Sequence, residues 1–88
     1  MMTFHYVYVL RSVKDQKLYI GVTKDLKNRL TQHNKGEVFA TKGRRPLDLV
    51  FYEAFANKED ALRREKYFKT DSGKRALKLM LKSYFAGK

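Results

Sequence analysis

The sequence contains no cysteine and a single proline among its 88 residues. Without cysteine, neither a disulfide bond nor a thiolate metal site can form, and a reducing compartment is consistent with this composition. The longest apolar run, Phe4 to Leu10, is interrupted by His5 and is too short to cross a bilayer. The first residues also lack the pattern of a secretory signal. We therefore expect a cytoplasmic protein that does not bind membranes.

Acidic residues are scarce as well, because nine Asp and Glu face 20 Lys and Arg, for a formal net charge of +11. A charge of this size attracts polyanions and speeds their encounter with the protein. Nucleic acid is the usual partner of such a protein, since its phosphates are densely and regularly spaced. Docking on an acidic protein would explain the charge but no other feature, and no obligate protein partner is indicated.

Length and composition predict one domain over residues 1–88. No stretch is rich in Pro, Gly or Ser, and the sequence has no internal repeat. A chain of this size buries only a modest core, so a deep substrate cavity is not expected. A functional site would be a shallow surface groove that takes a small part of a large partner.

Aromatic and β-branched residues predict two strands joined by a polar turn, at residues 4–10 and 18–22. If Arg11 pairs with Leu18, then Tyr8 lies opposite Gly21. Tyr19 is then the diagonal neighbour of Tyr8 on the same face of the hairpin. A register slip by one residue would place the two tyrosines on opposite faces.

Capping residues and helical spacing predict the remaining elements: a helix at 26–36, a loop at 37–46, a strand at 47–55, and helices at 57–69 and 76–84. Asp71, Ser72 and Gly73 are expected to separate the last two helices. The order β-β-α-β-α-α predicts an α+β fold with a small three-stranded, largely antiparallel sheet flanked by helices.

Arg29 and His33 are one helical turn apart and project from the same side of the first helix. The planar guanidinium of Arg29 suits phosphate oxygens, and His33 could donate to phosphate or carry a proton near neutral pH. Their offset from the apolar stripe predicts that both lie at the edge of the core. Taken alone, the position of Arg29 favours one more solvated cation.

Glu65 stands in the apolar stripe of the following helix, where an unpaired carboxylate would be costly. A divalent ion could compensate it, since Mg²⁺ often uses one or two protein carboxylates and keeps most of its waters. A salt bridge to a nearby Lys or Arg is the structural alternative. Glu53, on the third strand, is the second choice for a metal ligand.

The tyrosines are ambiguous alone, because aromatic residues in strands usually pack in or beside the core. A phenol has an unperturbed pKa of about 10 and becomes a useful base only if nearby positive charge lowers that pKa. Arg29 and a metal at Glu65 would supply such charge to Tyr8 or Tyr19.

Three segments together with Glu65 resemble the GIY-YIG nuclease superfamily. The segments are Tyr6-Val7-Tyr8, Tyr19-Ile20-Gly21 and the run from Thr23 to His33. The chain is most similar to small stand-alone bacterial members of the UPF0213 kind, and more distantly to the N-terminal domain of excinuclease C subunits. Its first motif differs in that Tyr6 stands where the family has Gly.

The resemblance implies an endonuclease that hydrolyses phosphodiester bonds in DNA, with a role in repair or recombination. It implies that Tyr8, Tyr19, Arg29 and His33 are catalytic, and that Glu65 binds one Mg²⁺ or Mn²⁺ ion. Gly21 would let the backbone pass close to the site. The general base, the preferred DNA structure and the choice between DNA and RNA stay open.

Further cations are expected to hold flanking phosphates, at Lys24, Lys27, Lys42, Arg44, Arg45, Arg63 and Lys66. The alternative function is a non-catalytic nucleic-acid-binding module. In that case Tyr6, Tyr8 and Tyr19 would stack on bases rather than assist hydrolysis, and Glu65 would have no explanation.

Overall fold

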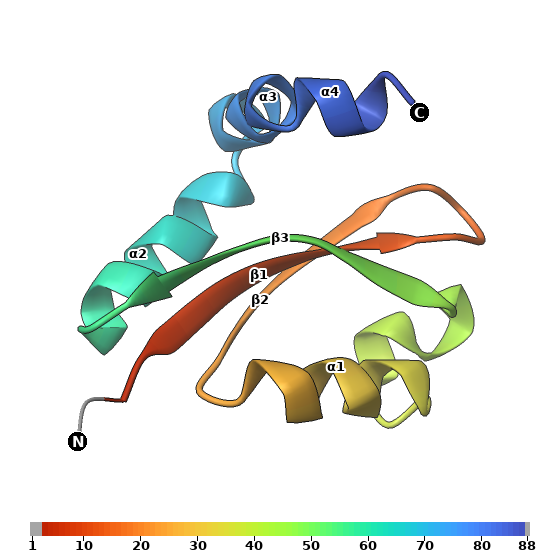
Figure 1. Ribbon diagram of the computed structural model, residues 1–88, viewed down its shortest axis with the longest axis horizontal. Helices are drawn as coiled ribbons and strands as arrows, with labels where there is room; N and C mark the ends of the chain where they lie inside the picture. Colours follow the sequence, from red (N-terminus) through yellow and green to blue (C-terminus); the bar gives the residue numbers. More distant parts are fainter. Residues whose placement is uncertain (1–2, 88) are drawn as a thin grey trace.

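The computed structural model describes residues 3–87 and has the predicted order of elements (Figure 1). The strands are β1 (His5–Ser12), β2 (Leu18–Thr23) and β3 (Leu47–Phe55). The helices are α1 (Leu26–Asn34), the 3₁₀ helix η1 (Phe39–Arg44), α2 (Lys58–Phe68), α3 (Asp71–Met80) and α4 (Lys82–Phe85). The predicted α+β class is confirmed.

The sheet is fully antiparallel with the strand order β2-β1-β3. Arg11 pairs with Leu18 and Tyr8 pairs with Gly21, so the predicted hairpin register is confirmed. On its other side β1 pairs with β3, and Tyr8 faces Tyr52 there. The central strand therefore carries Tyr8 between two neighbours, with β2 forming one edge of the sheet.

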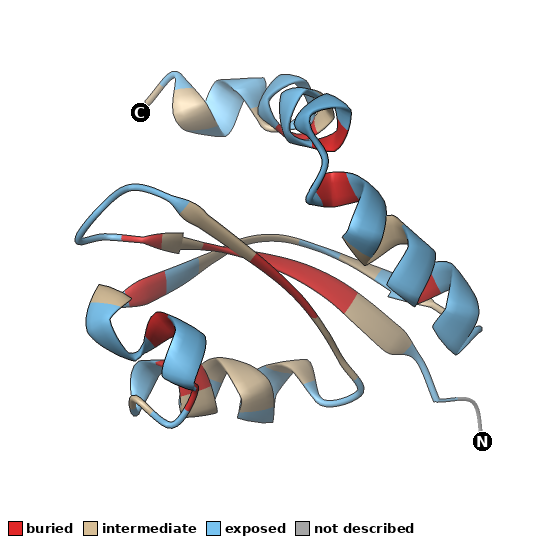
Figure 2. Cartoon of the chain, turned by 180° about the vertical axis from the view of Figure 1, so that it is seen from behind, coloured by how far each residue is buried: buried red, intermediate tan, exposed pale blue. Residues whose placement is uncertain are grey.

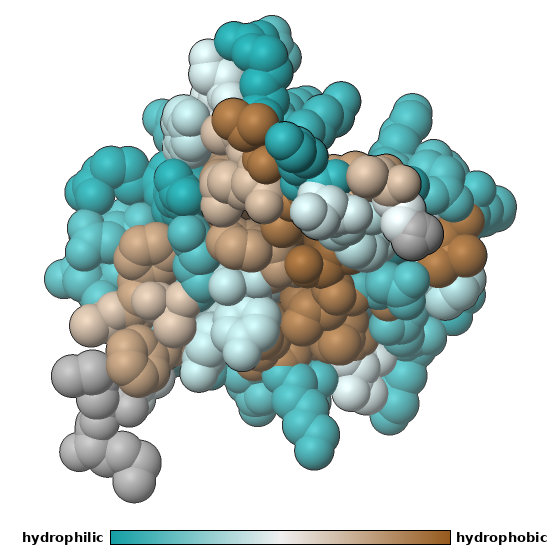
Figure 3. Space-filling view, turned by 45° about the horizontal axis from the view of Figure 1, so that its top comes forward, coloured by the Kyte–Doolittle hydropathy of each residue, from teal (hydrophilic) through white to brown (hydrophobic). Residues whose placement is uncertain are grey.

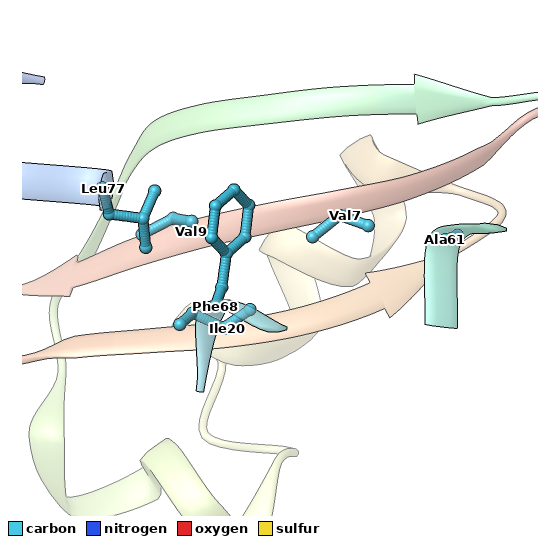
Figure 4. Close-up of a cluster of buried hydrophobic side chains, with 6 residues drawn as sticks. All are labelled: Val7, Val9, Ile20, Ala61, Phe68 and Leu77. Carbon is cyan, nitrogen blue, oxygen red and sulfur yellow. The ribbon is translucent and has the colours of Figure 1, made fainter. Parts of the chain in front are cut away.

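Two apolar clusters cover the two faces of the sheet. Helices α2 and α3 cover one face, where Phe68 and Leu77 pack on Val7, Val9 and Ile20 (Figure 4). Helix α1 lies on the opposite face (Figure 1), where the buried cluster includes Tyr8, Leu10 and Leu47. Buried residues accordingly gather along the central strand and on the helix surfaces that face it (Figure 2). The period-two alternation of β1 thus separates an aliphatic face from a tyrosine-bearing face.

Polar side chains fix the start of each long helix. The Asp25 carboxylate accepts from the backbone N–H of Asn28 at 3.1 Å and caps α1. Asn57 caps α2 by accepting from the Glu59 N–H at 2.8 Å. Lys35 ends α1, and Gly36 follows it with φ of +81°, a conformation that favours glycine.

Three predictions about the later elements are wrong. Residues 71–73 do not form a break, because Thr70 caps α3 and its hydroxyl accepts from the Gly73 N–H at 3.0 Å. Gly73 serves close packing instead, since a Cβ at this position would collide with the Tyr67 carbonyl. The segment predicted as a loop at 37–46 contains the helix η1. The predicted last helix is divided at Leu81 into α3 and α4.

One face of the molecule carries many hydrophilic side chains. Figure 3 shows them around the margin of the molecule, with a hydrophobic area near the centre of that view. Within residues 3–87, no helix is both long and apolar enough to cross a membrane.

Candidate active site

Tyr8 is the centre of the tyrosine-bearing face, and only 2% of its surface is exposed. Its ring lies across β2 above Gly21, where a Cβ would come within 2.5 Å of the Tyr8 hydroxyl oxygen. Glycine at position 21 is therefore required by the ring itself, beyond any closeness of the backbone to a substrate. Because Tyr8 is buried, it cannot stack on a base as the non-catalytic alternative assumed.

A chain of polar contacts extends from the Tyr8 hydroxyl. His33 Nε2 lies 2.9 Å from this oxygen, and Arg29 Nε donates to it at 3.4 Å. On the other side of the imidazole, His33 Nδ1 lies 2.7 Å from the Thr41 hydroxyl oxygen. Three of the predicted residues thus converge, and η1 adds Thr41 to them.

His33 is placed differently from the prediction. It is fully buried rather than at the edge of the core, because it fits between Tyr8 and η1. Burial lowers the pKa of His33 to about 4, and the nearby Arg29 charge acts in the same direction. The imidazole is therefore neutral near pH 7. It contacts the Tyr8 hydroxyl as an uncharged ring.

The tautomer of His33 couples its two neighbours, since a neutral imidazole has one N–H and one acceptor nitrogen. If Nδ1 carries the hydrogen, Thr41 accepts it and Tyr8 donates to Nε2. If Nε2 carries it, Thr41 donates, and the Tyr8 oxygen accepts from both His33 and Arg29. The second arrangement places two donors on the Tyr8 oxygen, which favours its ionised form.

Thr41 is the partner that the sequence did not reveal, and it gives a direct test of the network. We expect Thr41→Val to reduce the free energy of unfolding by about 1–3 kcal/mol, because a buried nitrogen of His33 loses its partner. Thr41→Ser keeps the hydroxyl and should lose less. Urea unfolding measures the stability, and imidazole ¹⁵N shifts report the tautomer. Equal unfolding curves and shifts for the two variants would contradict the assigned contact.

Tyr19 lies on the same face, as predicted from the register. Its ring centroid is 6.4 Å from that of Tyr8 and 5.1 Å from that of His33. It is half-buried, whereas Tyr8 is enclosed. Of the two phenols, Tyr19 is therefore the one that solvent or a substrate can approach.

The expected lowering of the phenol pKa does not hold for Tyr8. Burial raises the pKa of Tyr8 above its usual value, and the neighbouring Tyr19 and Glu65 act in the same direction. Arg29 opposes this shift through its hydrogen bond and its charge but does not outweigh burial. Burial outweighs the donors around the hydroxyl, so Tyr8 is a neutral phenol near neutral pH.

Arg29 is half-buried at the edge of this network. One N–H donates to Tyr8, and Nη1 donates to the Gln32 side-chain oxygen at 3.1 Å. These two contacts fix the plane of the guanidinium. Its other N–H groups take part in neither contact. A phosphate oxygen is the type of acceptor that those groups suit best.

Glu65 lies on α2, which packs against β1 and β2. Its carboxylate is close enough to contribute to the raised pKa of Tyr8. It also forms the salt bridge weighed as the alternative, because Lys69 Nζ lies 3.2 Å from Oε2. The side chain is 23% exposed. An ion pair of this i,i+4 kind contributes only about 0.3–0.5 kcal/mol, so a metal could displace it.

The donor set fits an ion that needs few protein ligands. Within residues 3–87, no three His, Asp or Glu side chains gather as a metal cluster. A lone carboxylate suits Mg²⁺, which keeps several waters and shares substrate phosphates. Glu53 does not compete, because both of its oxygens accept from Arg64, at 2.8 and 3.2 Å.

The predicted phosphate-binding cations are spread over several elements. Lys24, Lys27, Lys42, Arg45 and Lys66 are exposed. Arg63 is also exposed, although it pairs with Asp60. Arg44 is different, because its guanidinium contacts Asp15 at 3.0 Å and donates to the Leu18 carbonyl at 3.4 Å. These contacts join the β1–β2 turn to η1 and give Arg44 a structural role.

The chain is similar in sequence and in structure to known proteins. The family described as the GIY-YIG catalytic domain matches residues 4–78. A UPF0213 protein of Staphylococcus saprophyticus is 44% identical over 77 residues, which are 86% of this chain and 93% of the relative. A UPF0213 protein of Bacillus pumilus is 46% identical over 67 residues, covering 75% of this chain and 67% of the relative. The solution NMR structure of a Bacillus halodurans UPF0213 protein covers 88% of this chain and 84% of its own, with a TM-score of 0.55 and 38% identity.

Proposed function

Since this chain belongs to the GIY-YIG family of catalytic domains, we propose that it is a metal-dependent endonuclease that hydrolyses phosphodiester bonds in DNA. The observation that carries the proposal is the fixed Arg29 guanidinium, held by Tyr8 beside the accessible Tyr19. The net charge of +11 provides the attraction to the polymer. DNA repair or recombination is the setting that we propose for this activity.

Arg29 has the central role in the proposed reaction. Attack of water on phosphorus adds negative charge to the phosphate oxygens, and preorganised donors stabilise that charge. The N–H groups of Arg29 that do not contact Tyr8 or Gln32 would bind these oxygens. Tyr8 and Gln32 keep the guanidinium in place, so no reorganisation is needed as the charge develops.

Tyr19 is the phenol that we propose assists the attack of water on phosphorus. It is half-buried and accessible, whereas the Tyr8 oxygen is engaged by His33 and Arg29. Glu65 would hold Mg²⁺ or Mn²⁺, and such an ion supplies Lewis-acid stabilisation of the leaving oxygen. The exposed lysines of α1 and the adjoining turn, Lys24 and Lys27, would bind phosphates on either side of the cleaved bond.

A cleavage panel tests the proposal. We expect the purified protein to cut DNA in Mg²⁺ or Mn²⁺, and to cut an RNA of the same sequence more slowly. Duplex, nicked, branched and single-stranded DNA of one length should be compared by gel assay. Binding to all of these without cleavage of any, in either metal, would reject the enzymatic assignment and favour a binding module.

A further inference from the structure

A second feature of the tyrosine-bearing face lies on the β3 side of α1. Tyr6 and Tyr52 form an edge-to-face pair there, with ring centroids 5.9 Å apart. They border an open hollow of about 550 Å³. Its other lining residues include Leu26, Leu49, Lys24 and Lys27. Aromatic rings, aliphatic side chains, two cations and the Asp25 carboxylate, which caps α1, thus meet in one depression.

The register places this hollow next to the candidate active site. Tyr8 pairs with Gly21 on β2 and with Tyr52 on β3. The Tyr8 hydroxyl lies over Gly21, so Tyr52 is on the opposite side of Tyr8 from that hydroxyl. The two outer strands are two strand spacings apart, about 10 Å. That distance is comparable with the size of one nucleotide, so a strand bound at Arg29 can extend into the hollow.

The exposure of Tyr52 indicates a ring that the core does not need. Its surface is 51% exposed, although it sits in the middle of β3 opposite the buried Tyr8. Exposed aromatic rings beside cations are the usual platform for the bases of single strands, because every base has a face that can stack. Bases inside a duplex are already stacked and cannot reach such a platform.

We propose that the hollow binds an unpaired nucleobase, which stacks on Tyr52, while Lys24 and Lys27 contact the adjoining phosphates. Tyr6 supports the Tyr52 ring from the side. The inference deepens the proposed function, and it rests on that function for the identity of the polymer. It predicts that the preferred substrates contain an unpaired nucleotide beside the cleaved bond.

Binding measured in EDTA tests the hollow without cleavage. We expect Tyr52→Leu to weaken binding of labelled oligo(dT) roughly tenfold, and binding of a blunt duplex of equal length much less. The matched control is Tyr84→Leu on α4, where the tyrosine is 40% exposed, and it should change neither affinity. Tyr52→Phe keeps the ring and should bind like the unaltered protein. Fluorescence anisotropy gives the affinities, and circular dichroism confirms that each variant is folded.

Salt dependence separates stacking from charge. Tyr52→Leu should leave the slope of log affinity against log salt unchanged, whereas Lys27→Gln should reduce it by about one. Equal losses on single-stranded and duplex DNA for Tyr52→Leu, or no loss on either, would overturn the inference. The larger loss of single-strand than duplex binding in Tyr52→Leu can be measured even if the unaltered protein does not cleave DNA. If the protein cleaves DNA but this larger loss is absent, only the proposed function is supported. The two ideas can therefore fail separately.

Discussion

Replacing Arg29 with alanine is expected to lower the rate of DNA cleavage roughly 100- to 1,000-fold, with a small effect on DNA affinity. Loss of one preorganised donor to a developing oxyanion has an effect of this size in other enzymes. Arg29 contributes one of 20 basic residues to the total charge, so the attraction to DNA is nearly unchanged. Single-turnover cleavage at saturating protein measures the chemical step, and anisotropy measures the binding.

Two further variants make this result specific. Arg29→Lys keeps the charge but cannot bind Tyr8, Gln32 and a phosphate with one planar group, so it should recover little of the rate. Arg75→Ala on α3 removes the same charge at an exposed position away from the site and should cleave normally. Unchanged turnover in Arg29→Ala would refute the role that we give this residue.

The sheet could be predicted from the sequence because its information is local. Alternating apolar residues define the two faces of β1, and a short polar turn fixes its register with β2. The pairing of Tyr8 with Gly21 followed from that register alone. The bounds of β3 were predicted in full, since Leu49 to Tyr52 form an unbroken aliphatic and aromatic centre for the strand.

The environment of His33 could not be predicted, because its partners are distant in sequence. The helical period places His33 beside Arg29 but does not reveal that η1 folds over it. Thr41 is an ordinary residue in a basic segment, and no local pattern distinguishes it. Gly73 shows the same limit, since a glycine that packs against the Tyr67 backbone resembles one that ends a helix. Burial is decided by tertiary contacts, and so is the shifted pKa that follows from it.

Glu65→Gln is expected to reduce cleavage at least as strongly as Arg29→Ala. The substitution keeps the size of the side chain but removes the charge that would hold Mg²⁺ or Mn²⁺. DNA binding in EDTA should be retained, because the variant has one negative charge fewer. Mn²⁺ broadens NMR signals near its binding site, so the amide signals around Glu65 should broaden in the unaltered protein and stay sharp in the variant.

Lys69 provides the complementary test of the same carboxylate. Its ammonium group forms an ion pair with Glu65 Oε2, so it competes with a metal for that oxygen. Lys69→Ala should therefore lower the metal concentration needed for half-maximal cleavage and broadening, in the direction opposite to Glu65→Gln. Glu59→Gln, an exposed change in the first turn of the same helix, is the control for loss of an acidic charge. Cleavage that persists in EDTA, or normal cleavage by Glu65→Gln, would show that this carboxylate is only the partner of Lys69.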